Sequence, residues 1–230
     1  MFLVVDKGKL WTALVVIMLV SVIFVGVGIV YCFIPKKEYT VVIDAGHGGT
    51  DGGVFGVESG VSEAEVNLSV AYFLKNALEK YDIIVVMTRE GKRVLDGEGS
   101  KKEDFEIRKE IINSQKPNAV VSIHQNKFPD ASRRGSQVFF NNLNEGGRTL
   151  ANAVQKSLNE INLENVGREF SALKGDYYIL NCSNYPSCIV ECGFLSNHDD
   201  EKLLLDPKYR EKLAEKIAYG VVAFISERSL

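Results

Sequence analysis

The chain has few residues that could form cross-links. Among its 230 residues are four cysteines, Cys32, Cys182, Cys188 and Cys192, and only the last three fall in the part expected to fold as a globular domain. An odd number of cysteines does not make a disulfide framework. One short bridge between Cys182 and Cys188 and free buried thiols both remain open as interpretations.

Concentrated positive charge is also missing. The formal net charge is −3, and no block of lysine and arginine stands out, so a nucleic-acid partner is not indicated. No repeat, low-complexity tract or proline- and serine-rich linker follows the first 37 residues. The remainder, residues 38–230, is therefore expected to form one domain.

Charge is absent altogether from Leu10 to Pro35, a run rich in valine, isoleucine and leucine. This run is long enough to cross a bilayer as a helix. Lys7 and Lys9 precede it, and Lys36 and Lys37 follow it, so the positive-inside rule does not decide its orientation. The very short tail before it favours a signal anchor with the amino terminus in the cytoplasm.

Two alternatives to a retained anchor are a cleaved signal peptide and a lipoprotein signal. Cleavage requires small residues in an Ala-x-Ala-like pattern. Here the bulky Tyr31 stands directly before Cys32, which disfavours both alternatives. We therefore expect residues 1–37 to be a short tail and a transmembrane anchor, with the domain that follows outside the cytoplasm.

The rest of the sequence alternates between strand-like and helix-like segments. This pattern predicts an α/β fold, a mostly parallel twisted sheet with helices on both faces. The segments expected to matter most are strands at Tyr39–Asp44, Ala119–His124 and Ser187–Glu191, a short strand near Tyr177–Leu180, a helix at Glu63–Lys80, and a final helix capped by Asp206 with Pro207 in its first turn.

Residues with metal-binding chemistry stand where these segments end or begin. His47 follows the first strand, and His124 and Glu191 end two others. The carboxyl ends of strands in an open α/β sheet meet at one crevice. Two histidines and one glutamate around an open fourth position are typical of zinc hydrolases, which also need a free carboxylate as base. His198 is instead expected to lie in an exposed helical turn.

Helical periodicity separates two neighbouring glutamates. Ser62 and Glu65 have the spacing of a capping box, which gives Glu65 a structural role. Glu63 leads an apolar face that continues through Val66 and Val70, where a carboxylate is costly unless it is paired or bound to metal. The alternative is an acid that complements the helix dipole.

Each remaining candidate also has a purely structural interpretation. The glycine-rich segment around His47 could be a tight turn, and His124 could be a core histidine hydrogen-bonded to Asn126. Glu191 could form a buried ion pair with an arginine. Occurring together, these residues favour the metal site. Arg108 is expected to pair with an acid such as Asp104 or Asp44. Cys188 and Cys192 share the strand face opposite Glu191 and are expected to pack in the core.

The motifs that carry these residues resemble those of the zinc-dependent N-acetylmuramoyl-L-alanine amidases of the family-3 type. The likeness extends from Tyr39 to nearly the end of the chain. The matching motifs are Ile43–Gly49, Ser62–Leu68, Ser122–Asn126 and Ile189–Asn197.

The resemblance implies that His47, Glu63 and His124 bind one catalytic Zn²⁺ and that Glu191 is the catalytic acid/base. It also implies peptidoglycan as substrate, cleaved between N-acetylmuramic acid and L-alanine. Within the family, the chain looks most like the germination-specific amidases of spore-forming bacteria, which contribute to muramic-δ-lactam formation in spore cortex. That likeness implies attachment to the cell envelope or forespore membrane and an activating lipoprotein partner.

Two other functions compete with this interpretation. A zinc carboxypeptidase or aminopeptidase on a related scaffold would need an arginine clamp or a second metal, and the sequence contains no second cluster of histidine and aspartate. A non-catalytic, membrane-tethered peptidoglycan-binding protein would not need all the site residues to be present. Both are therefore less favoured than the amidase.

Overall fold

The computed structural model describes residue 11 and residues 15–22, 38–91 and 100–228. The chain divides into two compact units, Met1–Lys37 and Glu38–Leu230. Residues 15–22 are helical, and most of the predicted anchor lies outside the described residues. Within the described parts, no helix has both the length and the apolar character needed to span a membrane.

The second unit is built around a six-stranded sheet with the strand order β2-β1-β3-β6-β4-β5. Strand β1 pairs in parallel with β2 and with β3, β3 pairs in parallel with β6, and β4 pairs in parallel with β5. Only β4 with β6 is antiparallel. The strands are β1 (Thr40–Ala45), β2 (Ile84–Met87), β3 (Ala119–Asn126), β4 (Gln137–Phe140), β5 (Leu173–Lys174) and β6 (Ser187–Phe194). The mostly parallel α/β sheet predicted from the sequence is confirmed.

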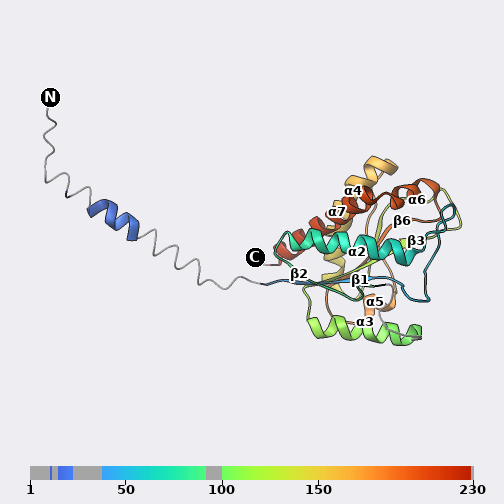
Figure 1. Ribbon diagram of the computed structural model, residues 1–230, viewed down its shortest axis with the longest axis horizontal. Helices are drawn as coiled ribbons and strands as arrows, with labels where there is room; N and C mark the ends of the chain where they lie inside the picture. Colours follow the sequence, from blue (N-terminus) through green and yellow to red (C-terminus); the bar gives the residue numbers. More distant parts are fainter. Residues whose placement is uncertain (1–10, 12–14, 23–37, 92–99, 229–230) are drawn as a thin grey trace, which may run out of the picture. The chain divides into compact units, whose positions relative to one another are not determined.

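Helices cover both faces of this sheet, as Figure 1 shows. Helices α2, α4 and α7 pack on one face through the larger apolar core, and α3 and α5 pack on the other through a smaller one. The helices are α2 (Glu63–Glu79), α3 (Lys101–Gln115), α4 (Glu145–Val166), α5 (Tyr178–Asn181), α6 (His198–Leu205) and α7 (Pro207–Glu227).

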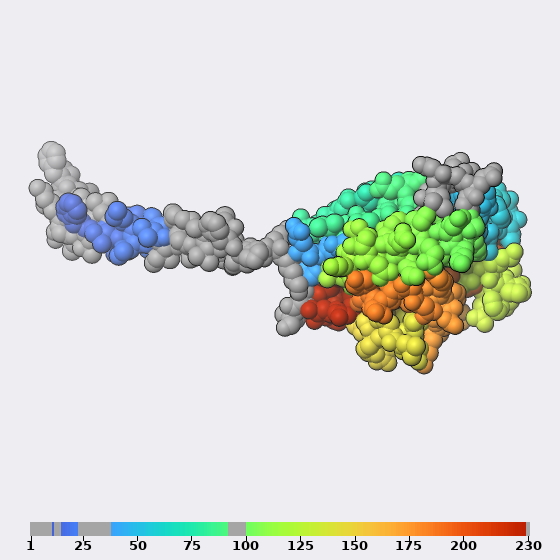
Figure 2. All heavy atoms as spheres, turned by 90° about the horizontal axis from the view of Figure 1, so that it is seen from below, coloured from blue at the N-terminus to red at the C-terminus, as the bar shows by residue number. Residues whose placement is uncertain are grey.

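The alternation of side chains along β6 decides which face of the sheet carries Glu191. Along β6, Cys188 and Cys192 point into the larger core, whereas Ile189 belongs to the smaller one. Because side chains alternate along a strand, Glu191 lies on the same face as Ile189, under α3 and α5. Figure 2 views the molecule from that side and shows α3 (green) beside the segment around α5 (orange).

Several local predictions can be checked against these elements. Asp206 caps α7, and Pro207 is its first residue, as expected. All three cysteines of the domain are free, so the alternative of a Cys182–Cys188 bridge is wrong. The strand predicted near Tyr177–Leu180 is also wrong, because this segment forms the short helix α5, which packs Ile179 and Leu180 into the smaller core.

Candidate metal centre

His47 lies in the loop after β1 and is held in an unusual backbone conformation. Its φ is 61°, in the left-handed region that non-glycine residues seldom adopt. Its Nδ1 atom lies 3.0 Å from Asp51 Oδ1, which leaves Nε2 facing Glu63 Oε1 at 3.3 Å. Such a partner on the second nitrogen fixes the orientation of a metal-binding imidazole.

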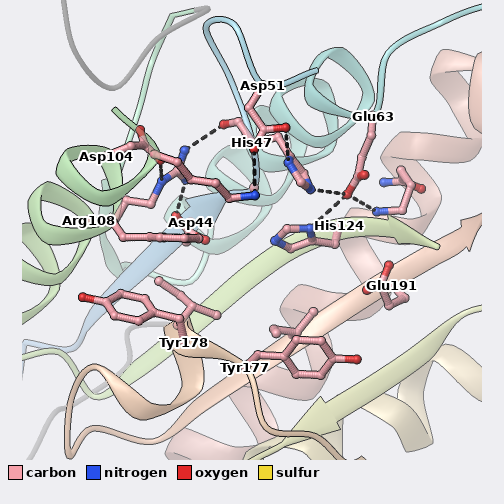
Figure 3. Close-up of a pocket in the computed structure, with 16 residues that line it drawn as sticks. Asp44, His47, Asp51, Glu63, Asp104, Arg108, His124, Tyr177, Tyr178 and Glu191 are labelled. Atoms are coloured by element: carbon pink, nitrogen blue, oxygen red, sulfur yellow. Dashed lines mark hydrogen bonds and ion pairs between the residues drawn. The ribbon is translucent and has the colours of Figure 1, made fainter. Parts of the chain in front are cut away.

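The structure brings together the three residues that the sequence predicted as metal ligands. His124, in β3, places Nδ1 2.9 Å from Glu63 Oε1, and the rings of His47 and His124 meet edge to face. One ligand atom from each of His47, Glu63 and His124 lies within 4.8 Å of the others. Figure 3 shows the three side chains converging at one end of the cleft.

Glu63 is buried at the start of α2 and keeps its negative charge. Burial by itself raises the pKa of this carboxyl group, but hydrogen bonds and charge interactions with His124 and His47 lower it well below its usual range. Backbone amides add support: Val54 N donates to Oε2 (2.9 Å) and Gln125 N to Oε1 (3.1 Å). An ionised carboxylate is the form that binds metal.

A pair of buried amide side chains extends this network behind Glu63. Asn67, one turn further along α2, donates to Glu63 Oε1 (3.3 Å) and to the carbonyl of Gly46 (3.0 Å). Gln125 Nε2 in turn donates to Asn67 Oδ1 (3.1 Å). These hydrogen bonds directly join the loop that carries His47, the helix α2 that carries Glu63 and the strand β3 that carries His124.

Two glycines allow the loop to approach the cluster closely. A Cβ atom on Gly46 would lie 2.2 Å from the His124 ring, and one on Gly53, whose φ is +69°, would lie 2.5 Å from Glu63 Oε2. Neither position can carry a side chain without displacing one of the clustered residues. Glycine at these two positions is therefore explained by close packing against the site.

The far end of the same loop is fastened to α6. The buried carboxylate of Glu201 accepts hydrogen bonds from the amides of Glu58 and Ser59 and from the Ser59 hydroxyl. Val57 N also donates to the carbonyl of Leu195, just after β6. The segment from His47 to Glu63 is thus held near its far end as well as at the site.

Buried arginines hold the loop from below. Arg108, on α3, donates to the carbonyls of Ala45 (2.8 Å) and His47 (2.7 Å) and pairs with Asp44 at 2.6 Å. It also contacts Asp104 at 2.7 Å, so both expected acids are its partners. Arg89 donates to the carbonyls of Ala45, Gly46 and Ala64.

Glu191 lies beside His124, its parallel neighbour in the register of β3 and β6. Its Oε2 atom is buried and has no hydrogen-bond partner among the described residues, so the alternative of a buried ion pair with an arginine is wrong. Burial and the charge of Glu63 raise the pKa of Glu191 to about 7, although His124 and His47 oppose the rise. A carboxyl group with this pKa can both accept and release a proton near neutral pH.

The metal-ligand candidates and Glu191 open onto one cleft with a volume of about 310 Å³. Figure 3 shows the metal-ligand candidates on one side, Arg108, Tyr178 and Tyr177 across from them, and Glu191 between His124 and Tyr177. The lining on the opposite side comes from Lys101, Asp104, Phe105, Arg108, Tyr177, Tyr178 and Ile179. The opposite side of the cleft thus combines charged and aromatic side chains.

The donor set suits zinc. Zinc in hydrolase sites typically takes imidazole nitrogens and carboxylate oxygens from three protein residues and keeps a fourth position open. Here the ionised carboxylate stands between two imidazoles, and the cluster faces the cleft. His198 is remote from this set: it is exposed and pairs with Glu58, as the sequence indicated.

Some residues of the site were not recognised from the sequence. Asp51 stands four residues after His47, and Arg89 stands two residues after the end of β2. A histidine followed by an acid in a glycine-rich loop, and a buried arginine at a strand end, are weak signals by themselves. Their roles depend on the loop's backbone conformation, which residue patterns do not specify.

Comparisons with known proteins agree with this geometry. A model of the N-acetylmuramoyl-L-alanine amidase family matches residues 41–223. The germination-specific N-acetylmuramoyl-L-alanine amidase of Bacillus subtilis is 33% identical over 201 residues, which are 85% of this chain and 83% of that protein.

Solved structures show the same likeness. The CwlD amidase of Clostridioides difficile, solved in complex with the GerS lipoprotein, is 31% identical, with a TM-score of 0.74 over 82% of this chain and 99% of that one. The AmiC2 N-acetylmuramoyl-L-alanine amidase of Nostoc punctiforme is 28% identical, with a TM-score of 0.70 over 83% of this chain and 99% of that one.

The buried Asp44 carboxylate should make stability depend on acid pH. Burial raises its pKa, but Arg108 and the hydroxyls of Ser122 and Thr88 outweigh that effect and lower it from 3.8 to about 2. A lowered folded-state pKa stabilises the fold above the unfolded value, by about 2 kcal/mol here, and this stability is lost as pH falls from about 4 to 2. In urea unfolding across this range, the parent should therefore lose stability more steeply than Asp44→Asn. Parallel curves for the two proteins would contradict the assignment.

Proposed function

Because the chain belongs to the N-acetylmuramoyl-L-alanine amidase family, we propose that its cleft uses one zinc ion to hydrolyse the amide between N-acetylmuramic acid and L-alanine in peptidoglycan. His47, Glu63 and His124 are the proposed ligands. Glu191 is the proposed acid/base.

One observation supports this proposal above the others. The ligand candidates stand beside a buried carboxyl group that has no hydrogen-bond partner among the described residues and whose pKa is raised by burial. A structural metal site has no use for such a group, whereas hydrolysis of an amide needs a proton acceptor that can later become a donor. The non-catalytic alternative leaves Glu191 unexplained.

The proposed roles follow from the positions of the side chains. Bound zinc supplies Lewis-acid chemistry, lowering the pKa of water and polarising a carbonyl group. Glu191 accepts the proton of the attacking water and then donates it to the nitrogen of L-alanine as the amide bond breaks. Asp51 holds the imidazole of His47 in one orientation. Asn67 does the same for the carboxylate of Glu63.

Metal content should separate ligands from neighbours. We expect His47→Ala, Glu63→Ala and His124→Ala each to lose zinc after purification, because each removes one of three donors. Glu65→Gln is the matched control, since Glu65 is exposed, on the same helical turn, and only its backbone amide contacts the cap residue Ser62. Unchanged zinc in any of the first three variants would remove that residue from the ligand set.

Product analysis tests the reaction and the role of Glu191. The full-length protein should release stem peptides with a free L-alanine amino group from purified peptidoglycan, as identified by mass. Glu191→Gln should retain zinc and fold but lose activity by roughly 10²–10⁴-fold, the usual contribution of a general acid–base group. Release of peptides cut at another bond would favour the peptidase alternative. Activity of Glu191→Gln within a few-fold of the parent would exclude the proposed role.

We further propose that residues 1–37 anchor the protein in a membrane with the catalytic domain on the extracytoplasmic side. The uncharged run from Leu10 to Pro35 and the bulky Tyr31 before Cys32 support retention of the segment. Protease added to intact cells or forespores stripped of their wall should digest the domain. A protected domain, or a mature amino terminus beyond Pro35, would show that the topology is different.

A role in spore cortex and a lipoprotein partner complete the proposal. The relative from Bacillus subtilis is a germination-specific amidase, and the similar amidase from Clostridioides difficile was solved with a lipoprotein. A partner that favours the metal-bound form raises zinc affinity by linkage. Zinc affinity and peptide release should therefore increase in extract from sporulating cells. Full zinc occupancy and full turnover by the purified protein alone would show that no activator is needed.

A further inference from the structure

Two adjacent tyrosines face the cleft from the start of α5, and their hydroxyl groups are in different situations. Tyr178 packs its ring on Phe105 with 4.8 Å between centroids, and its hydroxyl donates to Glu106 Oε1 at 3.1 Å. The hydroxyl of Tyr177 has no hydrogen-bond partner among the residues that the structure describes. The functions of the two residues therefore need separate explanations.

The ring of Tyr177 is held in place although its hydroxyl is free. It meets Phe139 edge to face at 5.6 Å. It also lies so close to Gly175 that a Cβ atom there would be 2.2 Å from the ring. Tyr177 is thus a fixed hydroxyl donor at the wall of the cleft.

The Tyr177 hydroxyl lies near the carboxyl group of Glu191. Figure 3 places the Tyr177 ring across the cleft from His47 and Glu63, below Glu191. Burial and the charge of Glu191 raise the pKa of Tyr177, so the phenol stays protonated and can donate a hydrogen bond. The Tyr177 hydroxyl is a fixed donor beside Glu191 and has no acceptor among the described residues. It is therefore suited to donate a hydrogen bond to an acceptor on the substrate.

The proposed mechanism indicates which part of the substrate lies nearest to Tyr177. Glu191 donates its proton to the nitrogen of L-alanine, so the departing peptide must lie on the side of the cleft where Glu191 stands. The first hydrogen-bond acceptor of that peptide is the carbonyl oxygen of the L-alanyl residue, on the carbon next to the one that bears the nitrogen. This oxygen is close to the reacting bond in every substrate of the class.

We propose that Tyr177 is a substrate-binding residue whose hydroxyl donates a hydrogen bond to the L-alanyl carbonyl oxygen of the stem peptide. This inference rests on the proposed amidase function. It assigns Tyr177, the cap residue before α5, to recognition of the leaving peptide, and it explains why Tyr177 keeps its hydroxyl free while Tyr178 does not.

A pair of substrates isolates this hydrogen bond. N-acetylmuramoyl-L-alanyl-D-isoglutamine contains the L-alanyl carbonyl. The isopropylamide of N-acetylmuramic acid keeps the scissile amide and a methyl group but lacks that carbonyl. For the full-length, zinc-loaded protein, Tyr177→Phe should lower kcat/KM for the peptide substrate about three- to tenfold, the usual worth of one hydrogen bond. It should change kcat/KM for the isopropylamide by less than about twofold.

Controls make the comparison specific. Tyr178→Phe removes an equivalent hydroxyl that is already bonded to Glu106 and should change either value by less than about twofold. If the isopropylamide is not turned over, its inhibition constant against the peptide substrate takes the place of kcat/KM. Calorimetric binding of free L-alanyl-D-isoglutamine adds a readout that does not depend on turnover, and Tyr177→Phe should weaken it about three- to tenfold.

The possible failures can be told apart. Equal losses on both substrates, or no loss on either, would overturn the role of Tyr177, as would unchanged dipeptide binding. If the parent protein cleaves neither substrate, the proposed function itself fails, and the calorimetric comparison still decides whether Tyr177 contacts the peptide.

Discussion

The arrangement of the site depends on one buried carboxylate. Glu63 contacts both histidines and accepts hydrogen bonds from two backbone amides and the Asn67 side chain. A buried charge without partners costs free energy. The loop, the helix and the strand that supply the partners of Glu63 are therefore constrained to meet at one point. The same charge raises the pKa of Glu191 nearby. Glu63 therefore positions the metal-ligand candidates and adds to the rise in the Glu191 pKa, whose largest cause is burial.

The loop after β1 can supply its histidine only because its backbone is held against strain. His47 has a positive φ, a conformation that persists where the surroundings enforce it. Arg108 and Arg89 enforce it by binding consecutive carbonyls from below, and Asp44 balances the charge of Arg108. Glu201 fixes the other end of the loop. The loop is thus held at both ends by contacts within the domain, and such contacts keep the histidine directed at the cleft.

The main features of the fold and site follow from residue patterns because they rest on strong periodicities. Buried parallel strands read as continuous apolar runs, so the ends that carry His47 and His124 are visible in the sequence. Helical spacing distinguishes the buried Glu63 from the exposed Glu65, but the capping box predicted for Glu65 is only half formed, because its backbone amide bonds to Ser62 and its side chain does not. Patterns fail where tertiary packing decides: the segment beginning at Tyr177 has residues typical of a strand but forms a helix, because Ile179 and Leu180 pack into the smaller core as one turn. Asp51 and Arg89 depend on the loop conformation, which no local pattern specifies.

The central claim is that Glu63 and the two histidines form a three-residue zinc site that leaves Glu191 free for proton transfer. An anomalous difference map from crystals of the zinc-loaded protein, measured at the zinc absorption edge, tests this directly. We expect one strong peak bonded to His47, Glu63 and His124, with Glu191 outside bonding distance. A peak elsewhere in the chain, or a zinc ion bonded to Glu191 as a fourth protein ligand, would contradict the account.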